Sequence, residues 1–255
     1  MKSVRICYYS ILIVSVIYGA SKNLTYDQGG IVRGDVSRKQ LALIFTGGDY
    51  ADGGPHIRGV LKKKNIKASF FFTGDFYRAP EKSELIRQLT ADGHYLGPHS
   101  DKHLLYCDWK SRDSTLVSKE EFVADILANF REMEAFGIPK EKANYFIPPS
   151  EWYNQTIVQW AEELRVILFN FTPGTSSNAD YTTPSMPEYL SSQIIYDRIL
   201  ACEKTDPNGF NGFILLLHIG THPERTDKFY YKLENLVDYL IAKGYSFVRI
   251  DELLK

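Results

Sequence analysis

Two histidines, His99 and His103, stand four residues apart directly after a short apolar run, a spacing that suits shared chemistry. If the backbone makes one helical turn there, residues i and i+4 lie on the same face with Cβ atoms about 5–6 Å apart. Two neutral imidazoles at that separation can share a metal ion, since zinc accepts histidine nitrogen at about 2.0–2.1 Å. The spacing alone fits a pair of surface histidines in a polar turn equally well, so the rest of the sequence has to decide.

Other side chains with chemical possibilities also follow apolar runs, at the points where predicted strands end. If those runs are neighbouring parallel strands, their carboxyl ends meet at one edge, and the side chains that follow them converge there. In chain order these residues are Asp49, Asp52, His99, His103, Pro148, Pro149, Glu151, Trp152, the segment 170–180 and His218. This clustering favours a site over scattered surface histidines.

The chain from Gln40 onward alternates short apolar runs with amphipathic stretches, which is typical of βα units around a parallel sheet. The clearest helix begins at a capping box of Ser118 and Glu121 and ends near Gly137. We count seven apolar runs: 41–45, 68–72, 95–97, 145–147, 166–169, 213–217 and 247–250. Seven repeats without an evident antiparallel segment predict an α/β fold with a closed or nearly closed barrel, similar to a TIM barrel, with its active site in the loops after the strands.

Composition and charge restrict the class of protein. The 255 residues are 44% hydrophobic with a net charge of -1, and no linker divides them. We therefore expect one barrel domain over residues 40–255, preceded by an N-terminal extension over 22–39. The balanced charge gives no reason to expect nucleic acid or an anionic membrane as a partner. Nothing in the sequence indicates the oligomeric state.

The N-terminus has the layout of a secretory signal peptide. Two positive charges within Met1–Arg5 precede an apolar run from Ile6 to Tyr18 and small residues up to Ser21. The run is shorter than the ~20 residues that span a bilayer, so we predict cleavage after a signal peptide over 1–21. The mature protein is then exported to the periplasm or the cell exterior, without stable membrane insertion.

Cleavage of the predicted signal peptide removes Cys7 and leaves only Cys107 and Cys202. These two cysteines could pair in an oxidising compartment, but neither their spacing nor their context requires it.

The order of the motifs resembles that of the polysaccharide deacetylases, carbohydrate esterase family four, over about residues 40–254. That family removes acetyl groups from nitrogen or oxygen of glycans on a seven-fold distorted β/α barrel. Residues 67–74 are similar to its second-strand signature, and 93–103 to its metal-binding histidine motif. Residues 146–150 resemble one side of its groove, and 215–218 the strand that carries its catalytic histidine.

The chain departs from this family at its first motif. The two adjacent aspartates of the family, one a base and one a metal ligand, correspond here to Thr46 and Gly47, and the arginine before the paired prolines is Ile147. Asp49 and Asp52 follow on a glycine-rich loop that is free to take unusual backbone angles. Either this loop rebuilds the site with a carboxylate from another position, or the site has decayed.

The resemblance implies an exported, metal-dependent hydrolase that removes acetyl groups from an acetylated polysaccharide or oligosaccharide. A divalent metal, with zinc preferred, would be held by Asp49, His99 and His103. The general base would be Asp52 or Glu151, with Asp52 preferred because its loop already converges on the site. His218 would protonate the leaving group.

The glycan is expected to contact Pro149, Trp152, Tyr153 and Asn170, with the aromatic rings stacking on sugar faces. Aromatic residues that pack over a helix start would look identical in the sequence. The alternative function is a catalytically deficient carbohydrate-binding protein that keeps the barrel and groove. A third possibility, a structural envelope protein, is disfavoured by the clustering of polar residues after the strands.

Overall fold

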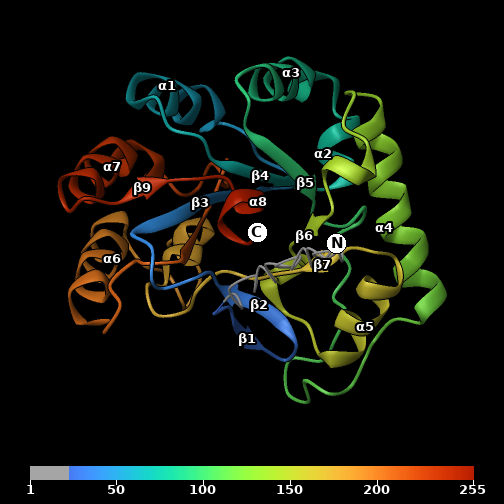
Figure 1. The fold of residues 1–255 in the computed structure, drawn as a ribbon. Coiled ribbons are helices and arrows are strands. Elements are labelled where there is room, and N and C mark those ends of the chain that lie inside the picture. The colour runs from blue at the N-terminus through green and yellow to red at the C-terminus, as the bar shows by residue number, and fades with distance from the viewer. Residues whose placement is uncertain (1–22) are drawn as a thin grey trace, which may run out of the picture.

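The computed structural model describes residues 23–255, so the predicted signal peptide lies outside the described residues. Parallel strands ringed by helices confirm the α/β barrel (Figure 1). The main sheet has the order β5-β4-β3-β8, with β9 also pairing with β3, and β6 pairs in parallel with β7. The bounds are β3 (Gln40–Gly47), β4 (Ser69–Phe72), β5 (Tyr95–Pro98), β6 (Tyr145–Phe146), β7 (Ile167–Leu168) and β8 (Phe213–His218).

An antiparallel hairpin, which the sequence analysis did not predict, lies in the N-terminal extension before the barrel. It consists of β1 (Thr25–Asp27) and β2 (Gly30–Arg33), joined through Gln28 and Gly29 with φ of 47° and 86°. Two left-handed residues are what a two-residue hairpin turn requires. Ile31 of β2 bridges Phe169 in parallel, after the end of β7. The N-terminal extension therefore contributes a strand to the barrel wall.

The helix predicted to begin at the capping box is confirmed. Ser118 and Glu121 form both hydrogen bonds of the capping box, and Asn154 caps the following helix. Within residues 23–255, no helix is both long and apolar enough to cross a bilayer. The helices are α1 (Gly54–Lys64), α2 (Gly74–Arg78), α3 (Ser83–Ala91), α4 (Lys119–Glu134), α5 (Gln155–Glu163), α6 (Ser192–Thr205) and α7 (Leu233–Ala242). Short 3-10 helices are η1 (Pro80–Lys82), η2 (Lys140–Lys142), η3 (Pro149–Glu151), η4 (Ser177–Tyr181) and η5 (Phe229–Lys232).

The last predicted strand, over residues 247–250, is shorter than expected. β9 covers only Ser246–Phe247, and Ile250 begins the helix α8 (Ile250–Leu253). The backbone N–H of Ile250 donates to Ser69 Oγ at 2.9 Å, which ties α8 to the start of β4. Ile250 and Leu253 join the apolar cluster inside the barrel, and Figure 1 shows α8 in the middle of the ring of strands. The helix therefore closes the N-terminal end of the barrel.

Strand alternation decides which side chains reach the other end of the barrel. On β3, Leu41, Leu43 and Phe45 pack outward against the helices, whereas Ala42 and Ile44 point inward. Successive side chains of a strand point to opposite faces, so Thr46 also points inward. The same alternation on β8 turns His218 inward, and Thr46 lies opposite His218 in the register. These two residues form part of the inner surface at the C-terminal end.

Candidate active site

A cavity of about 600 Å³ opens at the C-terminal ends of the strands, where the sequence predicts the site. Asp49, His99, His103 and His218 all line it. The remaining lining residues are Thr46, Gly47, Gly48, Tyr50, Thr73, Asp75, Lys102, Tyr181, Met186, Gly220, Thr221 and His222. A second cavity, of about 630 Å³, lies near the N-terminal ends of β5 and β6 and contains none of the predicted catalytic residues.

The imidazole of His99 is held in its neutral form on the wall of the cavity. Its Nδ1 lies 2.9 Å from the carbonyl oxygen of Ile147, which can only accept, so Nδ1 carries the proton and Nε2 keeps its lone pair. Burial, followed by the nearby His103, keeps the pKa of His99 well below its usual value. The rings of His99 and His103 lie with centroids 5.0 Å apart. The pair therefore offers two imidazoles to one side of the cavity, as predicted.

The backbone between the two histidines is not the helical turn expected from their spacing. Ser100 and His103 both have left-handed φ angles, of 73° and 55°. Asp125 of α4 replaces the missing helical hydrogen bonds, because its Oδ1 accepts from the backbone N–H groups of Asp101 and Lys102 at 3.2 and 2.9 Å. His103 N–H donates to Ser100 Oγ at 2.9 Å. The histidine pair thus depends on a carboxylate from a distant helix.

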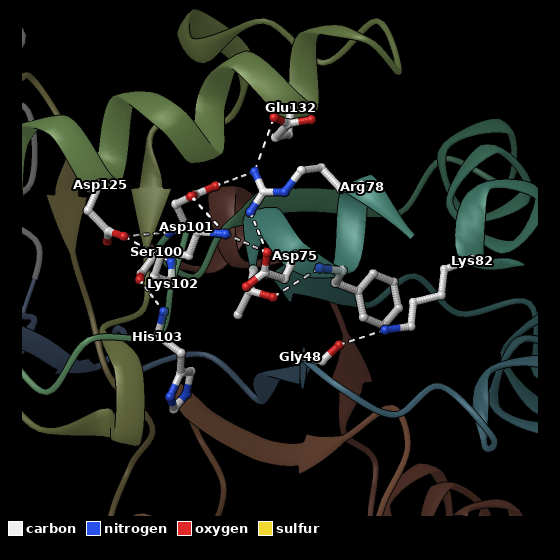
Figure 2. A network of polar contacts seen from close by, with 12 residues as sticks. Gly48, Asp75, Arg78, Lys82, Ser100, Asp101, Lys102, His103, Asp125 and Glu132 are labelled. Carbon is white, nitrogen blue, oxygen red and sulfur yellow. Dashed lines mark hydrogen bonds and ion pairs between the residues drawn. The ribbon is translucent and has the colours of Figure 1, made fainter. Parts of the chain in front are cut away.

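Figure 2 shows an ion-pair network behind this turn, with the imidazole of His103 pointing away from it. Arg78 contacts Asp75, Asp101 and Glu132 at 2.6, 2.7 and 3.1 Å. Lys102 contacts Asp75 at 2.7 Å. The network sets three carboxylates against two cations and holds the turn from behind, while Lys102 also lines the cavity beside the histidines.

His218 is paired with Asp180, a residue that the sequence analysis did not single out. His218 Nδ1 lies 2.6 Å from Asp180 Oδ1, and the backbone N–H of His218 donates to Asp180 Oδ2 at 3.0 Å. Burial alone would lower the pKa of His218, but the Asp180 carboxylate outweighs it, and the net effect is a raised pKa. Asp180 fixes the tautomer, so Nε2 is the nitrogen available to a substrate. Its only sequence signal is its place in the loop after the fifth apolar run.

Glu151 lies close enough to His218 and Asp180 for their charges to influence it, but it does not line the cavity. Burial raises the pKa of Glu151 to about 7; His218 opposes this effect and Asp180 adds to it. Ser150 and Glu151 both have left-handed φ angles, of 56° and 52°, which non-glycine residues rarely adopt. Asn170 Nδ2 donates to the Glu151 carbonyl at 2.8 Å and holds this conformation. A strained, held backbone beside a titratable group is typical of a functional position.

Asp52, the preferred base in the sequence analysis, uses both carboxylate oxygens in contacts with other residues. Its Oδ1 accepts from Thr221 N–H at 2.8 Å, and its Oδ2 contacts Tyr230 Oη at 2.9 Å and Lys228 Nζ at 3.0 Å. Burial would raise its pKa, but these three contacts outweigh that effect and lower it. Asp52 does not line the cavity of the histidines. The structure therefore argues against Asp52 as the base and makes it an anchor of its loop.

Asp49 lies on the cavity but is exposed. Its loop is fixed on both sides, because Lys82 Nζ donates to the Gly48 carbonyl at 2.8 Å and Asp52 is held as described. Figure 2 shows the contact of Lys82 with Gly48. Over residues 23–255, no three His, Cys, Asp or Glu side chains come together closely enough to hold a metal. Asp49 therefore shares the cavity with the histidine pair without completing a three-ligand set.

Thr46 and Gly47, which the sequence analysis aligned with the first motif of the family, differ in direction. Thr46 points into the cavity, and its buried hydroxyl has no hydrogen-bond partner among the described residues. Gly47 faces the outer core, where an added Cβ would lie 2.7 Å from Ile219, 2.9 Å from Phe72 and 3.0 Å from Phe76.

The chemistry of the donors on the cavity suits a divalent metal ion, although they do not form a closed three-ligand set among residues 23–255. Two imidazoles and an orphaned hydroxyl face the cavity, and Asp49 and Asp75 are the carboxylates that line it. Zinc and similar ions accept this mixture of nitrogen and oxygen ligands.

Of the residues expected to contact the glycan, only Trp152 keeps that possibility. Tyr153 is fully buried and its hydroxyl donates to the Asp27 carbonyl at 2.9 Å. Pro149 is buried, and Asn170 uses both ends of its amide on its own neighbours, Glu151 and Phe171. The aromatic residues on the cavity are instead Tyr50 and Tyr181. The sequence signal for Tyr153 was that of core packing, the alternative noted for it.

The cysteines do not form a disulfide with each other. Cys107 is a buried free thiol and Cys202 is a half-buried free thiol.

Comparisons with known proteins agree with this arrangement. A family model described as polysaccharide deacetylase matches residues 33–167, more than half of the chain. An uncharacterized 30.6 kDa protein of Geobacillus stearothermophilus is 26% identical over 231 residues, covering 89% of this chain and 75% of that protein. A peptidoglycan-N-acetylglucosamine deacetylase of Bacillus cereus is 23% identical over 221 residues, covering 86% of this chain and 90% of that protein.

Among solved structures, the chain is similar in fold to BA3943, described as a CE4 family pseudoenzyme from Bacillus anthracis. The TM-score is 0.69 at 20% identity, over 90% of this chain and 70% of that one. A mutant of BA3943 is described as having restored enzymatic activity. The match of the family model, together with the barrel and the histidine pair at its C-terminal end, shows that this chain belongs to the polysaccharide deacetylase family.

Proposed function

We propose that this chain is an exported, metal-dependent hydrolase that removes acetyl groups from an acetylated glycan, with a site rebuilt after the loss of the first motif. The observation that carries the proposal is that the neutral histidine pair and the His218–Asp180 pair line or border one cavity. A decayed site has no need for a hydrogen-bonded imidazole that keeps its lone pair toward the cavity. The name of the Bacillus cereus relative supports an N-acetylated glycan as the substrate class.

The residues take distinct roles in this proposal. His99 and His103 would hold the ion, with Asp49 as the third ligand, and zinc is the preferred metal. When bound, the ion supplies polarisation of the acetyl carbonyl and a lower pKa of bound water. His218 Nε2 carries a proton to the leaving amine or alcohol, while Asp180 holds the ring. Glu151, with a pKa of about 7, is the carboxyl group best matched to accept a proton near neutral pH.

Acetate release tests the proposal directly. The substrates are acetylated xylan, chitin oligomers and peptidoglycan, each with added zinc and with a chelator. We expect acetate from at least one substrate, its loss with chelator, and its recovery when zinc is added back. His218→Ala serves as the matched inactive variant, because it leaves the histidine pair intact. No acetate from any substrate with zinc present would contradict the proposal.

A second candidate function is glycan binding without turnover. The observation that favours it is the first motif, where Thr46 supplies no carboxylate and the space beside Gly47 is filled by Ile219, Phe72 and Phe76. The description of BA3943 as a pseudoenzyme points in the same direction. Binding of an acetylated oligosaccharide without acetate release would support this function over hydrolysis.

Export is proposed from the N-terminal sequence alone. The mature protein should begin between about Ala20 and Leu24, after the small residues. N-terminal sequencing of the protein from its native host tests this, and an intact Met1 on a cytoplasmic protein would refute it.

A further inference from the structure

We infer that Trp109 and Trp152 form an aromatic platform outside the cavity that binds pyranose rings of the same glycan chain, a proposal that rests on the glycan assigned under the proposed function. Trp109 is 58% exposed. Its ring stacks on Trp152 with centroids 5.5 Å apart and planes 25° apart. The two stacked indole rings make a contiguous apolar surface that is open to solvent on one side, the kind of feature that marks an interaction site.

The platform is held in place before any ligand arrives. Trp152 Nε1 donates to the Asp108 carbonyl at 3.1 Å. Asp108 in turn closes its own turn, because its Oδ1 accepts from Lys110 and Ser111 N–H at 2.8 Å each, and its N–H donates to the Ser114 carbonyl at 3.0 Å. The segment that carries Trp109 is therefore fixed by hydrogen bonds. A preorganised ring loses little conformational entropy on binding.

Arg112 supports Trp152 from the protein side. Its guanidinium carbon lies 4.4 Å from the centroid of the Trp152 ring, and its Nε donates to the Tyr153 carbonyl at 2.7 Å. Its charge is paired with Asp27 at 2.9 Å. Arg112 and Trp109 both pack on Trp152, so the ring of Trp109 is the one presented to solvent. Because the nearby cation is already paired, the surface suits a neutral sugar better than an anionic polymer.

The platform lies on the same edge of the barrel as the cavity. The chain reaches Trp109 from His103, beyond the C-terminal end of β5, and reaches Trp152 from Glu151, beyond the C-terminal end of β6. Leu104, 37% exposed, lies between His103 and Trp109 in the sequence. Both tryptophans therefore follow strands whose C-terminal ends face the cavity.

A second set of aromatic residues stands at the cavity itself. Tyr50 and Tyr181 line it and are 36% and 47% exposed. A glycan that is held at the cavity and extends over β5 and β6 would meet further rings at Trp109 and Trp152. The geometry therefore points to a polymeric or long oligomeric glycan, with the platform as a subsite that short fragments do not reach.

Chain length is the variable that tests this inference. The probes are the dimer and hexamer of N-acetylglucosamine and the corresponding acetylated xylose oligomers, titrated by calorimetry with chelator present so that no turnover occurs. We expect the wild type to bind a hexamer more tightly than its dimer. Trp109→Ala should weaken hexamer binding about tenfold, since alanine cannot replace the stacking of an aromatic ring on a ring of the ligand, and should leave dimer binding unchanged.

The matched controls are Trp109→Phe and Tyr231→Ala. The phenylalanine variant keeps a stacking ring and should retain most of the hexamer affinity, which separates loss of the ring from a folding defect. Tyr231 is 65% exposed but lies on η5 and does not line the cavity, so its removal should change neither affinity.

Equal hexamer binding by wild type and Trp109→Ala, or equal loss for dimer and hexamer, would overturn the platform. The platform would also be overturned if the wild type bound neither the N-acetylglucosamine hexamer nor the acetylated xylose hexamer more tightly than the corresponding dimer. These outcomes are independent of acetate release: a platform without turnover refutes only hydrolysis, and turnover without length dependence refutes only the platform.

Discussion

Replacing Glu151 by glutamine should stabilise the folded protein at alkaline pH while removing its activity. A pKa raised from its ordinary value of 4.5 to about 7 means that the folded state disfavours the carboxylate by about 3 kcal/mol, at about 1.4 kcal/mol per pKa unit. The folded state binds more protons than the unfolded state between these two values. The stability of the wild type is therefore highest, with respect to this group, below pH 4.5 and falls as the pH rises through 7.

Glutamine carries no charge at any of these pH values, so Glu151→Gln removes the contribution of this side chain to the pH dependence of stability. We expect Glu151→Gln to raise the free energy of unfolding by about 2–3 kcal/mol at pH 8 and to leave it nearly unchanged at pH 4.5. In a chain of this size that gain corresponds to a rise in Tm of roughly 4–12 °C. Turnover should fall by about 10²- to 10⁴-fold, the usual worth of a general base.

Urea unfolding at pH 4.5, 6 and 8 measures this, with Glu162→Gln, an exposed glutamate of α5, as the matched control. The control should show the same pH dependence as the wild type. A Glu151→Gln variant with the same stability increment at all three pH values would refute the buried-carboxylate reasoning. A variant with full turnover would refute the role of Glu151 in proton transfer.

Four further substitutions test the rest of the site. His99→Ala or His103→Ala should sharply lower bound zinc in elemental analysis with the fold intact by circular dichroism, and equal metal content would exclude the pair as ligands. Asp52→Asn should cost about 1–2 kcal/mol in urea unfolding through its lost charge-assisted hydrogen bonds and change turnover only a few-fold; a hundredfold loss at unchanged stability would restore Asp52 as the base. Asp180→Asn should lower the pKa of His218, so the alkaline limb of the pH–rate profile moves to lower pH; an unmoved limb would show that His218 is not the acid.

The barrel, the histidine pair and His218 could be predicted from the sequence because local patterns encode them. Alternation along β3 and β8 is enough to turn Thr46 and His218 inward. The capping box at Ser118 and Glu121 can be recognised in the sequence, and both of its hydrogen bonds are present in the structure. Such signals act over a few residues, so tertiary packing does not overrule them.

The errors fall where a side chain's direction is set by residues far along the chain. Asp52 is turned away from the cavity by Thr221, Lys228 and Tyr230, whose contact with its loop appears only in the folded barrel. Asp180 is presented by a loop with its own short helix, which has no periodic pattern. The hairpin of β1 and β2 was missed because strands of three and four residues around two glycines give too little alternation to detect.

The packing around Gly47 limits which side chains this position can accept. An aspartate there would collide with Ile219, Phe72 and Phe76 at their present sizes. An acidic side chain at position 47 therefore requires one of these neighbours to move or to shrink, and a buried truncation typically costs about 2–5 kcal/mol. A carboxylate added in the exposed loop at Asp49 would displace nothing from the core, so that loop is the place where this cavity can gain negative charge at little cost in stability.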